Sequence, residues 1–119
     1  MTLHWSEFPD APEVGTEICK CGDLEMGVSA ITVGAFPVLL VRDGAGVRAF
    51  VNACPHQFLP LTQRSTDILS ENGSRLICSN HDAAFSAETG EGTAGLGIGC
   101  ALSPIPVCDS NGILWVAEG

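Results

Sequence analysis

Two short segments of this chain each place a histidine close to a cysteine, and they limit its chemistry more than any other feature. The segments are Cys54-Pro55-His56 and Cys78-Ser79-Asn80-His81. Each supplies one thiolate and one imidazole, the side chains that hold iron or zinc in proteins. The remaining histidine, His4, lies in the N-terminal tail, where we expect it to be solvated.

Length and charge limit the architecture and the partners. A chain of 119 residues has room for one domain with a modest core. Its 14 acidic residues outnumber its 5 basic ones, and the net charge of −9 disfavours nucleic acid and anionic membranes as partners. A basic protein would suit this charge better, although solubility alone explains any single carboxylate equally well.

The cysteines point to a reducing compartment. The sequence shows no signal segment and no apolar run near the roughly 18 residues of a membrane span, so we expect a cytoplasmic protein. There, six cysteines are better explained by metal binding and free thiols than by disulfides. Cys19-Lys20-Cys21 would suit a metal by spacing, but no ligand nearby completes a site, and we interpret the two as free, at least partly buried thiols.

Two predicted hairpins account for the positions of the Cys–His segments. The first turns at 43–46, returns through a strand at 47–52 and ends just before Cys54. The second turns at Asn72-Gly73, a strong hairpin signal, and its returning strand ends at Cys78. Because both segments follow hairpin strands, they can face each other across the fold.

The rest of the chain also favours short strands over helices. We expect residues 1–14 to form an N-terminal arm in extended conformation, followed by a single domain over 15–119. Trp5 and Phe8 are expected to pack this arm against the domain. We interpret 88–92 as a turn and 95–99 as a loop. Further strands are predicted at 16–19, 28–33, 38–41, 67–70, 84–86, 102–107 and 113–116. The predicted class is all-β, with small antiparallel sheets.

The paired motif resembles the Rieske family. Cys-x-His followed by Cys-x-x-His, with Pro60-Leu61 after the first half and the proline-rich 102–107 near the end, carries the resemblance over most of the chain. The resemblance implies a β-sandwich with a cluster-binding subdomain formed by two hairpin loops, near 54–62 and 78–86.

The same resemblance implies a 2Fe-2S cluster and its ligands. In this family two cysteines hold one iron and two histidines hold the other. Cys54 and Cys78 would then bind the inner iron, and His56 and His81 the outer, more exposed one. Since neutral imidazoles replace two anionic thiolates, such clusters accept an electron at about −150 to +300 mV.

A further consequence of the resemblance is a potential at the low end of that range. Respiratory Rieske proteins place a serine and a tyrosine, which hydrogen-bond the cluster and its cysteine, where this chain has Ala83 and Phe85. Their additional pair of cysteines, which forms a disulfide, corresponds to Leu59 and Asn80. The pattern is therefore that of soluble Rieske-type ferredoxins.

Three functions follow from these residues. The favoured one is a ferredoxin, not itself an enzyme, that passes single electrons from a flavin reductase to a terminal oxygenase and has no small-molecule substrate. A tetrahedral zinc site is the second, although zinc fingers usually pair Cys with Cys and His with His. The third is an interaction subunit without a cluster, because Phe58 and Asp82 replace glycines common in the family. An oxygenase would need a separate iron site with two histidines, and only His4 is uncommitted.

Overall fold

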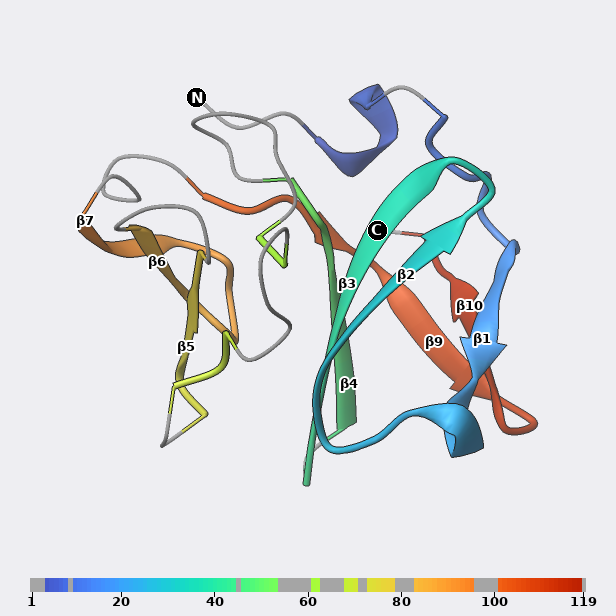
Figure 1. Ribbon diagram of the computed structural model, residues 1–119. Coiled ribbons are helices and arrows are strands. Elements are labelled where there is room, and N and C mark those ends of the chain that lie inside the picture. Colours follow the sequence, from blue (N-terminus) through green and yellow to red (C-terminus); the bar gives the residue numbers. More distant parts are fainter. Residues whose placement is uncertain are drawn as a thin grey trace.

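The computed structural model describes residues 4–8, 10–44, 46–53, 61–62, 68–70, 73–78, 83–95 and 101–118. In these ranges the strands form three antiparallel sheets, and the helical structure consists of two single 3-10 turns (Figure 1). No helix in this part of the chain is long and apolar enough to cross a membrane. The predicted all-β class is confirmed.

The central sheet has the strand order β2-β3-β4-β8. One of its two inner strands, β3, is buried on both faces, and residues 38 to 41 are each at most 1% exposed. Because side chains alternate along a strand, Val38 and Leu40 enter one core while Leu39 and Val41 enter another. This confirms the core strand predicted there. The strands are β2 (Gly27–Val33), β3 (Phe36–Asp43), β4 (Gly46–Val51) and β8 (Pro104–Ile105).

An outer sheet, ordered β1-β10-β9, covers one face of the central sheet (Figure 1). Leu114 and Val116 of this sheet pack against Val38 and Leu40, and we call this apolar cluster the outer core. The β9–β10 hairpin turns at Asn111-Gly112, where both residues have positive φ, as a tight hairpin turn requires. The strands are β1 (Glu17–Lys20), β9 (Val107–Ser110) and β10 (Ile113–Val116).

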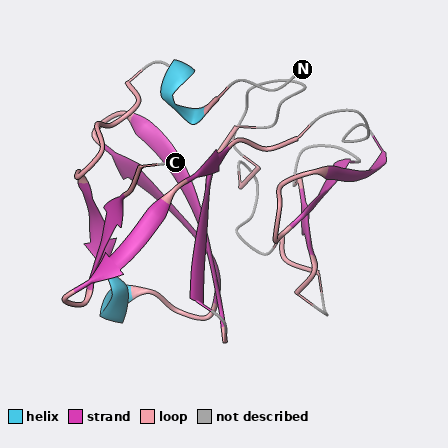
Figure 2. Cartoon of the chain, turned by 180° about the vertical axis from the view of Figure 1, so that it is seen from behind, coloured by secondary structure: helices cyan, strands magenta, loops and turns pink. Residues whose placement is uncertain are grey.

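A small sheet, ordered β5-β6-β7, lies on the other side and stands apart from the two larger sheets in the ribbon (Figure 2). Leu76 and Phe85 from this sheet share an apolar cluster, here called the inner core, with Leu39 of β3. Gly90, with φ of +84°, brings the turn after β6 so close that a Cβ would lie 2.9 Å from the Leu102 carbonyl oxygen. The strands are β5 (Arg75–Ile77), β6 (Ala83–Ser86) and β7 (Gly92–Gly95).

The N-terminal residues differ in part from the extended arm that we expected. Trp5–Glu7 forms a 3-10 turn, because the His4 ring accepts a hydrogen bond from the Ser6 N–H and the Glu7 carboxylate accepts one from the His4 N–H. Trp5 is 5% exposed in the outer core, with Phe8 packed against it, so both do pin the segment. The boundary after residue 14 remains a prediction.

Two strand predictions need correction. β7 occupies Gly92–Gly95, where a turn and a loop were expected, because pairing with β6 outweighs the weak strand propensity of glycine. Residues 102–107 do not form one strand: the chain passes from β8 in the central sheet to β9 in the outer sheet at Pro106, which has no N–H to donate. The predicted second hairpin is confirmed where it is described: Leu69 bridges Leu76, the Ser70 N–H donates to the Arg75 carbonyl oxygen and the Ile77 N–H donates to the Ile68 carbonyl oxygen.

Candidate metal centre

Among the four predicted ligands, Cys78 is the one that lies within the described residues, and Cys54, His56 and His81 fall outside them. Cys78 directly follows β5 and is 4% exposed in the inner core. Its thiol is free of any disulfide. A buried free thiol at the end of a strand is available to a metal, and its apolar surroundings keep water away.

A backbone hydrogen bond closes the base of the second Cys–His segment. The Cys78 N–H donates to the Ala83 carbonyl oxygen at 2.9 Å. This bond lies next to the last pair of β5 and β6, Ile77 with Ala84. His81 belongs to the four residues between the bonded partners, 79–82. The ladder of β5 and β6 therefore holds the two ends of this segment together.

The side chain of Asn52 links the residues just before the first Cys–His segment to the residues that follow it. Asn52 follows β4, and its Oδ1 accepts a hydrogen bond from the Leu61 N–H at 2.9 Å. Its Nδ2 donates to the Thr62 hydroxyl, also at 2.9 Å. Cys54 and His56 lie between these partners in the sequence. No local pattern in the sequence indicates this role, because the hydrogen-bond partners of Asn52 become its neighbours only once the chain folds back.

The residue after the first segment and both ends of the second segment meet in one place, whereas Ala53, just before Cys54, packs against the outer core. Leu61, Cys78 and Ala83 all belong to the inner core, between the small and central sheets. Two thiolates and two imidazoles are the donor set of a Rieske cluster, and the buried Cys78 thiol suits the less exposed, cysteine-bound iron. No group of three or more metal-binding side chains occurs among the residues that the structure describes. The roles of Cys54, His56, Cys78 and His81 as ligands remain predictions.

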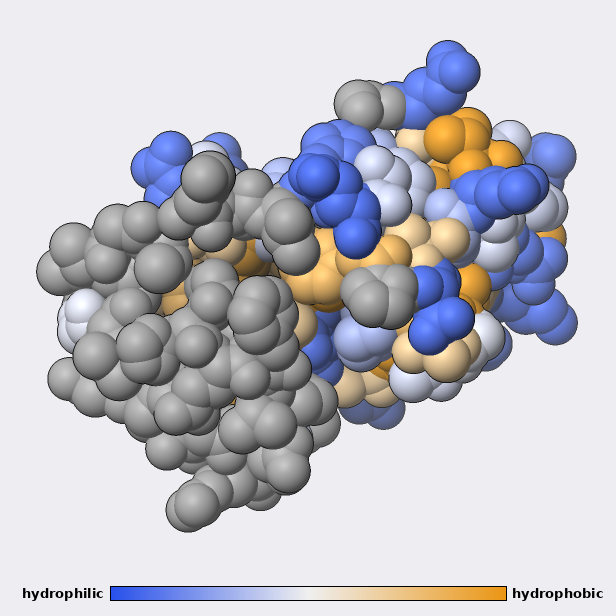
Figure 3. Space-filling model, turned by 90° about the horizontal axis from the view of Figure 1, so that it is seen from above, coloured by the Kyte–Doolittle hydropathy of each residue, from blue (hydrophilic) through white to orange (hydrophobic). Residues whose placement is uncertain are grey.

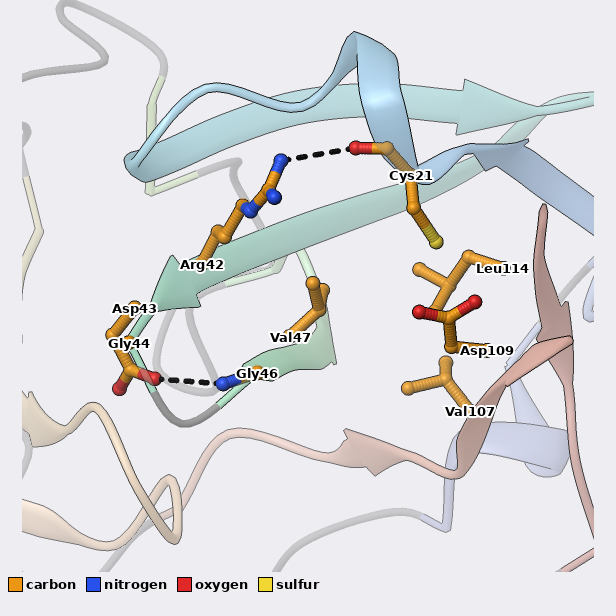
Figure 4. A pocket seen from close by; sticks show the side chains of 9 residues that line it. All are labelled: Cys21, Arg42, Asp43, Gly44, Gly46, Val47, Val107, Asp109 and Leu114. Atoms are coloured by element: carbon orange, nitrogen blue, oxygen red, sulfur yellow. Dashed lines mark hydrogen bonds between the residues drawn. The ribbon is translucent and has the colours of Figure 1, made fainter. Parts of the chain in front are cut away.

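The Cys19 and Cys21 pair lies elsewhere, against the outer core. Both thiols are free and partly exposed, as predicted. Cys21 lines a pocket of about 450 Å³ between the β3–β4 turn and the outer sheet (Figure 4). Arg42 spans this pocket, and its guanidinium donates to the carbonyl oxygens of Cys21 and Leu24. Because Gly46 and Val47 at the start of β4 line the pocket, it lies at the opposite end of that strand from the ligand segment.

The surroundings of these two thiols keep them protonated. The Cys21 sulfur points toward Asp109 (Figure 4). Burial raises the pKa of Cys21 above its ordinary value of 9.0, and a hydrogen bond to the Asp109 carboxylate and its negative charge raise it further. Burial, then the charges of Cys21, Asp23 and Glu17, raises the pKa of Cys19. Since thiolates bind metals, this pair is a poor metal site at neutral pH.

Comparison with known proteins agrees with the fold and with the motif. The family model described as Rieske [2Fe-2S] domain matches residues 15–96. The ferredoxin component of the alkene monooxygenase system of Xanthobacter autotrophicus (strain ATCC BAA-1158 / Py2) is 36% identical over 120 residues, which span 100% of this chain and 88% of that protein.

Two solved structures are similar in shape. The ferredoxin of carbazole 1,9a-dioxygenase from Nocardioides aromaticivorans IC177 has a TM-score of 0.73 at 23% identity, covering 90% of this chain and 100% of its own. A chain in the complex of reduced oxygenase and oxidised ferredoxin in carbazole 1,9a-dioxygenase has a TM-score of 0.68 at 25% identity, covering 85% of this chain and 99% of its own. The family match and the full-length similarity to a ferredoxin component establish that this chain belongs to the Rieske [2Fe-2S] domain family, with a 2Fe-2S cluster as its cofactor.

Proposed function

We propose that this protein carries single electrons on a Rieske cluster of low potential, from a flavin reductase to a terminal oxygenase. The observation that carries the proposal is the buried Cys78 thiol, which shares the inner core with Leu61 after the first Cys–His segment and Ala83 after the second. In this proposal Cys54 and Cys78 hold one iron, and His56 and His81 hold the other. The Xanthobacter relative, a ferredoxin component of an alkene monooxygenase system, supports the same role.

The protein's own residues would set the environment of the bound cluster. When bound, the cluster supplies a one-electron redox couple. The inner core, with Leu76 and Phe85 fully buried beside Cys78, excludes water from the cysteine side. Ala83 and Phe85 bring no hydroxyl to this side. The reduced, more negative cluster would therefore be stabilised by fewer hydrogen bonds than in respiratory Rieske proteins, which have a serine and a tyrosine at these positions. That absence of donors is the reason for proposing a low potential.

The charge of the chain suits basic docking partners. With a net charge of −9, the protein would attract a basic patch on the reductase or oxygenase. Seen from above, hydrophilic residues are spread over much of the described surface, with smaller apolar patches between them (Figure 3). Electron transfer to the partner should therefore slow as ionic strength rises, and a rate insensitive to salt would contradict this docking mode.

The free thiols of Cys19, Cys21, Cys78 and Cys108 support a cytoplasmic location.

The direct test is spectroscopic, on protein purified without oxygen. We expect a brown protein with about two irons and two acid-labile sulfides per chain, whose visible bands bleach with dithionite. A Cys78→Ser variant should lose the cluster, whereas Cys108→Ser, at an exposed position, should keep it. A redox titration then tests the potential. A colourless protein containing zinc, or no metal, would refute the carrier function, and a potential near +300 mV would refute only the argument from Ala83 and Phe85.

A further inference from the structure

Asn52 is a buried polar residue at the entrance to the first ligand segment. It is 4% exposed and stands two residues before Cys54. Both ends of its amide are hydrogen-bonded: Oδ1 accepts from the Leu61 N–H and Nδ2 donates to the Thr62 hydroxyl, each at 2.9 Å. Such a residue is retained in an apolar core only if its hydrogen bonds are satisfied.

The backbone of Asn52 is also held in place, by a hydrogen bond to the central sheet. The Asn52 N–H donates to the Pro37 carbonyl oxygen of β3 at 3.1 Å, which ties its backbone to the central sheet. The side chain then reaches across to Leu61, which is fully buried in the inner core. Asn52 therefore links three parts of the chain: the end of β4, strand β3 of the central sheet, and Leu61 and Thr62, which follow the first Cys–His segment.

From these contacts we propose that Asn52 is a positioning residue, which fixes the span of the first segment and so the placement of Cys54 and His56 for the cluster. This inference rests on the proposed ligation. An amide suits the role because it combines an acceptor oxygen with a donor NH2 group, and here the oxygen accepts from the Leu61 N–H while the NH2 donates to the Thr62 hydroxyl. The second segment needs no such side chain, since the β5–β6 ladder closes it through Cys78 and Ala83.

The test compares three variants of the full-length holoprotein. Asn52→Ala removes both hydrogen bonds, and Thr62→Val removes the one to Nδ2. Val116→Ala, in the outer core, lowers stability and leaves both hydrogen bonds of the Asn52 side chain in place. The measurements are the rate of iron release to a chelator, the g-values of the reduced cluster in electron paramagnetic resonance, and the thermal midpoint.

We expect Asn52→Ala to release iron about tenfold faster, which corresponds to an activation free energy for iron release that is about 1.4 kcal/mol lower. The same variant should shift the g-values of the reduced cluster. Thr62→Val should change both in the same direction by less, and Val116→Ala should lower only the thermal midpoint. Unchanged g-values and release rate in Asn52→Ala, or an equal change in Val116→Ala, would overturn the inference. If Asn52→Ala does not fold, Thr62→Val decides by the same readings. A wild-type protein without a cluster would instead refute the proposed function, and this inference with it.

Discussion

The two faces of the central sheet make different contributions to this protein, although the same strands build both. On one face the outer core joins Val38 and Leu40 to the outer sheet, and its described residues include none of the predicted ligands. On the other face the inner core includes Cys78, together with Leu61 after the first Cys–His segment and Ala83 after the second, while Ala53, just before Cys54, packs against the outer core. Stability and cluster chemistry should therefore be separable by substitutions on opposite faces of a single strand.

The largest expected effect comes from adjacent leucines of β3. Leu39, at 0% exposed, lies in the inner core, and Leu40, at 1%, lies in the outer core. Truncating a buried leucine to alanine costs about 2 to 5 kcal/mol, so both Leu39→Ala and Leu40→Ala should destabilise the protein by comparable amounts in denaturant unfolding. Only Leu39→Ala should also change the potential and speed up the loss of iron. Equal effects on the cluster would mean that the two faces are coupled through β3.

A hydroxyl placed in each core tests the electrostatic side of the comparison. Ala83, 1% exposed, lies beside Cys78, and Ala49, 3% exposed, lies in the outer core. A hydrogen bond to a charged group is worth about 1.5 to 3 kcal/mol. For one electron this is roughly 65 to 130 mV, an upper bound because the oxidised cluster accepts the bond too. Ala83→Ser should therefore raise the midpoint potential, within that bound.

Ala49→Ser is the matched control, since it adds the same hydroxyl on the other face. Its potential should equal that of the wild type in a redox titration. A rise in both variants, or in neither, would contradict the hydrogen-bond explanation for a low potential.

A smaller effect is expected where the small sheet is tied to the central sheet. Arg48 of β4 donates to the Ala87 carbonyl oxygen through Nε at 2.7 Å and pairs with Asp43 at 2.7 Å. The paired side chains are 28% and 42% exposed, so solvent screens the ion pair, and its contribution is about 0 to 1 kcal/mol. Arg48→Met should cost about 1 to 2 kcal/mol, because it also leaves the Ala87 carbonyl without this donor.

Asp43→Asn separates the two contributions of Arg48, because it weakens the ion pair and leaves the bond to Ala87 in place. It should cost less than about 1 kcal/mol in the same unfolding measurement. If Asp43→Asn costs as much as Arg48→Met, the tie between the sheets depends on the ion pair instead of the carbonyl contact.

The elements of the fold also differ in how far the sequence predicts them. β3 and the turn after it follow local patterns, an apolar run and a glycine-rich turn, so they were predicted. β7 has the composition of a loop, and it becomes a strand only through pairing with β6, a contact that no local pattern contains. The ligands are predicted by the spacing of the motif, whereas the role of Asn52 depends on partners nine and ten residues away that folding brings close.

The smallest expected effect concerns the thiols packed against the outer core. Burial raises the pKa of Cys19 and of Cys21 above 9.0, and Asp109 adds to the shift at Cys21. A folded-state pKa above the unfolded value means that their contribution to stability is complete below pH 9 and is lost as the pH rises past it. Alkylation followed by peptide mass mapping should therefore modify exposed Cys108 before either of them at pH 8.

Asp109→Asn should speed up the reaction of Cys21 and leave the redox potential unchanged, because Asp109 lines the pocket at the far end of β4 from the ligand segment. A change in potential would show that this end of the molecule influences the cluster.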